Sequence, residues 1–142
     1  MRHRQQGATI VSFALAGPLF MLIVFGMMEF SSVLSAWMVI TNEAREAARY
    51  GAVTYDSTVD PTTELANETA SIRAYVQQRL NGQLAASGVY QQPGVTFLST
   101  GTNQTPLVQV TIYYQVPLVI PLVSQFLPNP FPIAARSAMR AE

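Results

Sequence analysis

The stretch ATIVSFALAGPLFMLIVFGMM, residues 8–28, is a long apolar run near the N-terminus of the chain. No charged residue interrupts it between Arg4 and Glu29, and a helix needs about 20 such residues to cross the hydrocarbon core of a bilayer. Arg2 and Arg4 precede the run, whereas the segment after it mixes acidic and basic residues. The positive-inside rule therefore predicts a transmembrane helix with its N-terminus in the cytoplasm and the rest of the chain outside.

A cleaved secretory signal is the main alternative to a transmembrane helix. Ala14-Leu15-Ala16 matches the small-residue cut site of such signals. The apolar run continues well past that site, however, and the apolar core of a signal spans only about 7–15 residues. A low share of charged residues, 11% of the 142-residue chain against about 25% in ordinary soluble domains, also suits a membrane protein. A transmembrane span therefore fits better.

The same helix is predicted to continue beyond the membrane. Residues 29–55 contain no Pro, and the segment Asn42–Arg49 is rich in good helix formers. We expect one helix of about 40 residues or more, half of it in lipid. Pro18 lies in the membranous half, where it is tolerated but should kink the helix or loosen one turn.

Glu29 is the only charged residue between Arg4 and Glu43. Either it lies at the outer membrane interface, or it faces a partner helix, because ionisable residues at membrane depth usually have a partner. No basic residue of this chain lies within a helical turn of it. We therefore expect any partner of Glu29 to come from another subunit or from water.

The chain after Tyr55 predicts a second helix. Asp60 is a suitable N-cap and Pro61 a suitable first helical residue. The expected helix runs from about Thr62 to Ala86, unless Asn81-Gly82 ends it earlier. Its apolar residues form one stripe, which comprises Leu65, Ile72, Val76, Leu80 and Leu84, with Thr69 in the gap.

Beyond Gly88 the apolar period changes to two, which is typical of strands. Val95 and Phe97 indicate a short strand, which could begin as early as Val89. Apolar and polar residues then alternate from Val108 to Val116, which predicts a strand with one buried face. A lone hairpin is too weak to fold by itself, so a third strand is expected at 133–139.

Residues 117–132, named here the apolar hook, connect the last two predicted strands. Five prolines exclude a regular helix or a central strand. The segment is nevertheless strongly apolar. It is expected to form either a lid folded over the core or an exposed surface for contact with protein or membrane. Its candidate contact residues are Leu118, Ile120, Leu122, Phe126 and Phe131.

No catalytic constellation can be assembled from this sequence. The single His lies at position 3 and there is no Cys, so a Ser-His-Asp set or a thiolate metal site is excluded outside the membrane. Glu64 and Glu68 share a helical face and could suggest a cation site. No Asp-rich calcium loop accompanies them, so a solvated helix face is the better interpretation. Zero net charge disfavours nucleic acid. We expect no enzyme activity, cofactor, metal or small-molecule substrate.

Two ends of the sequence resemble one family, the TadE-like (TadE/TadG) proteins, which are minor-pilin-like components of tight-adherence, type IVb pilus systems. The residues that carry the resemblance at the N-terminal end are Gln6–Leu15, Pro18–Phe20, Phe25–Phe30 and Asn42–Val53. The last of these resembles the family segment N-x-A-R-E-G-A-R-Y. Ala134–Glu142 resembles the usual ending of the family.

The resemblance implies processing by a prepilin peptidase that cuts after Gly7 and leaves Ala8 as the new N-terminus. Pilin-like proteins normally carry Glu at the fifth residue after the cut, where it pairs with the terminal amine of a neighbouring subunit. This chain has Ser12 there. Ser supplies no charge for that contact, and it leaves a less polar helix that crosses a bilayer more readily.

The expected fold class is α+β: a long transmembrane helix that extends beyond the membrane, then a small domain of one helix on a two- or three-stranded antiparallel sheet. The expected divisions are a cytoplasmic leader-like tail (1–7), a transmembrane helix (8–30), its extramembrane continuation (31–55) and an extracytoplasmic domain (56–142). The expected location is the bacterial inner membrane, with the last division periplasmic or extracellular.

Two non-catalytic roles stay open. The first is a pilus-associated or pilus-assembly component. The second is an uncleaved accessory subunit of a larger membrane complex, which stabilises its partners through the long helix and the outer domain. In both roles the partners are membrane lipid and other membrane protein subunits. The residues expected at contacts between helices are Ser12, Gly17, Gly26 and Glu29, with Ser31, Ser32 and Ser35 as further positions of close approach.

Overall fold

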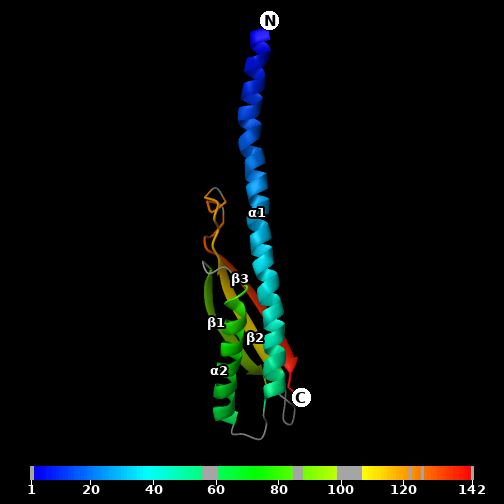
Figure 1. The fold of residues 1–142 in the computed structure, drawn as a ribbon, viewed down its shortest axis with the longest axis vertical. Coiled ribbons are helices and arrows are strands. Elements are labelled where there is room, and N and C mark those ends of the chain that lie inside the picture. Colours follow the sequence, from blue (N-terminus) through cyan, green and yellow to red (C-terminus); the bar gives the residue numbers. More distant parts are fainter. Residues whose placement is uncertain are drawn as a thin grey trace.

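The chain is a long helical rod joined to a small three-stranded sheet (Figure 1). The computed structural model describes residues 2–55, 61–84, 88–98, 107–121, 123–125 and 127–141. Its elements follow the order α1 (Arg2–Thr54), α2 (Pro61–Leu80), β1 (Val89–Leu98), β2 (Leu107–Val116) and β3 (Phe131–Arg140). The predicted α+β class is confirmed, and the sheet has three strands.

Helix α1 is continuous over 53 residues. The prediction of one helix that outlasts the apolar run is therefore confirmed, and the helix continues through Pro18. Figure 1 shows its N-terminal half clear of the rest of the chain and its C-terminal half against the sheet.

Helix α2 ends at Leu80 rather than Ala86, at the earlier of the two predicted stops. The amide of Leu84 still donates to the carbonyl of Leu80, over 3.1 Å, and closes a last turn. The predicted N-cap Asp60 lies outside the described residues. Glu68 is only 4% exposed, so the interpretation of its helix face as solvated was wrong at this position. The hydroxyl of Thr54 at the end of α1 donates to Glu68 Oε1 over 3.2 Å.

The sheet is antiparallel with β2 at its centre. Along β2 the residues Val108, Val110 and Ile112 are fully buried, whereas their neighbours in sequence are partly exposed. This is the predicted alternation of a buried and a polar face. The register shifts once, between Gln91 and Gly94 of β1, where Pro93 is buried. A bulge accommodates Pro in an edge strand because no ladder hydrogen bond is required of it there.

Both helices cover the buried face of the sheet. Helix α1 contacts β2, β3 and α2, whereas α2 contacts α1 and β1. The buried residues of α1 recur every three or four positions, singly or as adjacent pairs, so they form one stripe along the helix. The fully buried ones are Ile40, Ala44, Ala47 and Ala48. They belong to the same core cluster as Ile72 and Val108. The second half of α1 is thus part of the domain core, and the division at residue 55 stays a prediction.

Small residues let α1 approach its neighbours closely. A Cβ atom added at Gly51 would lie 2.5 Å from Ile72 Cδ1 of α2 and 2.9 Å from Val108 Cγ1 of β2. Both distances are shorter than carbon atoms tolerate. Gly51 and the alanines before it therefore set the distance between the helix and the sheet.

Polar and aromatic contacts join α1 to α2 beside this core. Glu43 Oε2 accepts from Arg79 Nε over 2.6 Å, and Glu43 Oε1 accepts from Gln83 over 2.9 Å. The hydrogen bond and charge of Glu43 raise the pKa of Arg79 above its ordinary value. Tyr50 and Tyr75 stack with ring centroids 4.6 Å apart. Glu43 is buried, and a buried carboxylate persists only when it is paired in this way.

Replacing Gly51 by Val should destabilise the domain, because the added atoms overlap Ile72 and Val108. The expected loss in free energy of unfolding is about 2–3 kcal/mol, as for overpacked cores. The measurement is denaturant unfolding of the detergent-solubilised chain, followed by circular dichroism. Gly26→Val is the control on the same helix, since nothing lies within 4 Å of its added Cβ. Equal stability of the two variants would contradict the packing described here.

Candidate functional site

The N-terminal half of α1 is an exposed apolar surface. Among the described residues, α1 is the one helix long and apolar enough to cross a membrane. Its most apolar segment is not buried by any other part of the described chain. Phe13 and Leu15 are among the most exposed large side chains of the molecule. A helix in the core of a soluble protein is mostly covered, whereas this one is not. The described residues thus contain one candidate membrane span, in α1, where the apolar run predicts it.

Glu29 interrupts that exposed surface. It is 6% exposed, and from Thr9 to Val39 it is the only buried residue. Its Oε1 atom accepts hydrogen bonds from the backbone amides of Val119 and Ile120, each over 2.7 Å. The prediction that any partner of Glu29 must come from another subunit or from water was therefore wrong. The partner is the apolar hook of the same chain.

The apolar hook has its own hydrogen bonds at this junction. Asn129 brackets Leu118: its Oδ1 accepts from the Leu118 amide over 3.0 Å, and its Nδ2 donates to the Leu118 carbonyl over 3.2 Å. The Ile120 carbonyl then accepts from the amides of Val123 and Ser124 over 3.0 and 3.1 Å. Figure 1 shows the hook rising from the sheet alongside α1, so a lid over the core does not describe its position.

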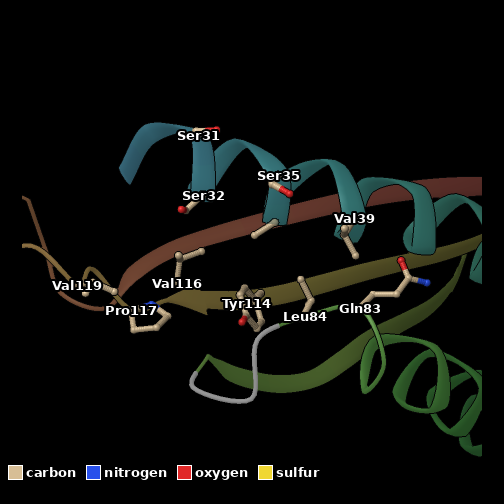
Figure 2. Close-up of a pocket in the computed structure, with 11 residues that line it drawn as sticks. Ser31, Ser32, Ser35, Val39, Gln83, Leu84, Tyr114, Val116, Pro117 and Val119 are labelled. Carbon is tan, nitrogen blue, oxygen red and sulfur yellow. The ribbon is translucent and has the colours of Figure 1, made fainter. Parts of the chain in front are cut away.

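A groove of about 440 Å³ lies between α1 and the start of the hook. Figure 2 shows α1 on one side and β2 on the other, with Gln83 and Leu84, which follow α2, toward one end. The α1 wall includes Ser31, Ser32 and Ser35, three of the small residues predicted at close approaches. Ser32 donates to the Met28 carbonyl of its own helix over 3.2 Å. Burial raises the pKa of Tyr114, on the opposite wall, above its ordinary value.

The other predicted contact residues fall into two groups. On α1, Gly17 and Gly26 have nothing within 4 Å of an added Cβ, and Ser12 is exposed. They lie on surface that the chain itself leaves open, and their roles stay predictions.

Gly7 and Ala8 are helical, but their side-chain surroundings lie outside the described part. In the hook, Leu118 is buried, Ile120 and Phe131 are half-buried, and Leu122 and Phe126 lie outside the described residues.

The described residues include no group of three or more His, Cys, Asp or Glu side chains that could hold a metal ion. Glu29, Glu43 and Glu68 are each buried on α1 or α2 and engage groups of the same chain. Their arrangement suits the joining of elements. It brings no nucleophile and base together over a substrate.

Glu29 lies on the same face of α1 as the core residues, because steps of four, three and four residues lead from it through Val33 and Ala36 to Ile40.

Comparison with known proteins bears on this same stretch. Residues 7–49 match the family model described as TadE-like protein. The match is confined to this part of the chain. The resemblance drawn from its motifs is thereby confirmed.

The TadE-like match includes the apolar span, Glu29 and most of the packed stripe of α1. It ends at Arg49, before α2 and the sheet, so the resemblance of Ala134–Glu142 to the family ending stays a prediction. The searches of curated proteins and of solved structures found no match.

The contact between Glu29 and the hook was missed from the sequence. Its one signal was the position of Glu29 on the face of α1 that continues the apolar stripe. A charged residue on such a face indicates a buried partner. Nothing in the sequence pattern says which segment supplies it.

Glu29→Leu should destabilise the protein, because the amides of Val119 and Ile120 lose their acceptor. Hydrogen bonds to charged groups contribute about 1.5–3 kcal/mol, and a loss of that size is expected in unfolding of the detergent-solubilised chain. Glu29→Gln keeps an acceptor oxygen and should lose less. Met28→Leu, at an exposed neighbour, should be neutral. A Glu29→Leu protein as stable as Met28→Leu would refute the contribution of this contact.

Proposed function

We propose that this protein is a membrane-anchored, non-catalytic structural component of a Tad-type pilus apparatus. The observation that carries the proposal is the TadE-like match of residues 7–49 on a helix whose apolar half stays uncovered by its own chain. An uncovered apolar helix can exchange lipid contacts for contacts with other helices, which is what assembly of a pilus-type structure requires. The second half of α1 fixes a folded domain to that helix.

The proposed orientation places the N-terminus in the cytoplasm and the sheet outside the inner membrane. Arg2 and Arg4 before the span support it through the positive-inside rule. The proposed partners are membrane lipid and other membrane protein subunits. In this arrangement Ser12, Gly17 and Gly26 lie on the part of α1 that is open to helix contacts.

A second role is favoured by one specific residue. Ser12 stands where pilin-like proteins carry Glu, and it supplies no charge for the terminal amine of a neighbouring subunit. An uncleaved accessory subunit of a larger membrane complex would have no use for that charge. The fate of Gly7 separates the two roles.

Mass spectrometry of the N-terminus of the protein from native membranes tests the choice. A pilus component processed by a prepilin peptidase should begin at Ala8. Gly7→Val should block that cut, whereas Gly17→Val, deeper in the span, should leave it unchanged. Pilus assembly is then scored for each variant. An uncut N-terminus in cells that assemble pili would exclude the processed-pilin role and support the accessory subunit.

Single-cysteine labelling tests the orientation, because the chain contains no Cys. Asn67→Cys, on an exposed position of α2, should react with a membrane-impermeant maleimide in intact spheroplasts. Gln5→Cys should react only after permeabilisation. The parent chain is the unlabelled control. The reverse pattern would overturn the proposed orientation while leaving the membrane span intact.

A further inference from the structure

The apolar hook lies beside the part of α1 at which the apolar run ends. Glu29 directly follows residues 8–28, and its Oε1 atom accepts hydrogen bonds from the amides of Val119 and Ile120. From this junction the hook rises alongside α1 toward its N-terminal half (Figure 1). We propose that the hook inserts into the same bilayer that α1 crosses, as a second and shallow lipid contact, and that Glu29 is the residue that positions it.

The depth of the junction follows from the length of the span. A run of about 20 apolar residues just covers the hydrocarbon core, and residues 8–28 are such a run. Glu29 therefore lies where hydrocarbon gives way to headgroups. Any segment that rises from Glu29 along α1 enters the acyl region, whichever side of the membrane the domain occupies.

The side chains of the hook suit that location. No charged residue occurs from Pro117 to Ala135. Val119 is 81% exposed and Leu127 is 44% exposed. In water such surface costs about 25 cal/mol for each Å² left exposed, whereas lipid chains cover it at no such cost. The described part of the chain leaves much of these two side chains uncovered.

The backbone of the hook suits it as well. Irregular backbone enters lipid only when its polar groups are satisfied. Five prolines in the hook carry no N–H. Six described amides donate to acceptors of the chain: those of Leu118, Val119, Ile120, Val123, Ser124 and Leu127. Glu29 supplies the acceptor for two of these six, and so removes two N–H groups from the polar surface of the hook.

Lipid is the occupant favoured over a second protein because the hook is continuous with the surface of α1 that already faces the bilayer. Phe30 and Met28, beside Glu29 on α1, are also highly exposed. A protein partner would have to displace lipid from both surfaces. Contact between the hook and another chain is therefore treated as an outcome of the test.

The test uses the full chain reconstituted in vesicles of phosphatidylethanolamine and phosphatidylglycerol. Single cysteines at Leu127 and Val119 are labelled with an environment-sensitive fluorophore, and quenching is measured with lipids that carry a spin label near the headgroup. Val53→Cys is the matched control, because Val53 is 74% exposed at the opposite end of α1. Phe20→Cys, within the span, reports whether α1 itself is inserted.

Insertion of the hook predicts blue-shifted emission at both hook sites and quenching several-fold above that of the Val53 label. Water-like, unquenched emission at Leu127 and Val119, with the Phe20 label in lipid, would overturn the inference and leave the membrane anchor standing. A blue shift without lipid quenching would also overturn it, in favour of a protein contact. Failure at Phe20 would instead contradict the anchored protein of the proposed function.

The positioning role of Glu29 has its own readout. Glu29→Leu should reduce quenching of the Leu127 label several-fold, because the hook loses its attachment to α1. Glu29→Gln retains an acceptor oxygen and should restore most of the quenching. A Glu29→Leu protein with unchanged hook quenching would show that Glu29 does not position the hook, even where its stability is reduced.

Discussion

The close approach of α1 to the sheet sets the geometry of the whole folded domain. The helix side of that contact is built from Ala44, Ala47, Ala48 and Gly51, and Gly51 leaves no room for a Cβ between Ile72 and Val108. Interiors this dense transmit displacement instead of absorbing it. The domain is therefore rigidly attached to the helix that anchors it, and movement of the span in the membrane moves the sheet with it.

The same stripe explains why a carboxylate occurs at the end of an apolar run. Glu29 lies on the stripe four residues before Val33, the first residue of α1 that packs against the core. At Glu29 the contact is with the backbone of the hook instead of the sheet. One side-chain oxygen accepts both of these hydrogen bonds, and a medium of low polarity strengthens such bonds. Glu29 thus joins α1 to the hook at a point of the helix that precedes the residues packed against the core.

The packing of α1 on the sheet and the hydrogen bonds of Glu29 to the hook leave two surfaces of the described chain uncovered. The span, with Ser12, Gly17 and Gly26, is open to lipid or to other helices, and the tip of the hook is open beside it. The TadE-like match covers the apolar span and the packed stripe as far as Arg49. One helix in this family match therefore serves two surfaces, one toward the membrane and one toward its own domain.

From the sequence alone we could predict the apolar span, the continuation of its helix, a second helix with two alternative ends, and three strands. These are local properties: the length of an apolar run, a period of 3.6 or 2, and the positions of Pro and Gly. Three features became visible only in the folded chain: the burial of Glu68, the close approach of Gly51 to two elements, and the binding of Glu29 to amides 90 and 91 positions away. Such contacts depend on how α1 lies across the sheet, and periodicity along one element carries no information about which distant segment will meet it.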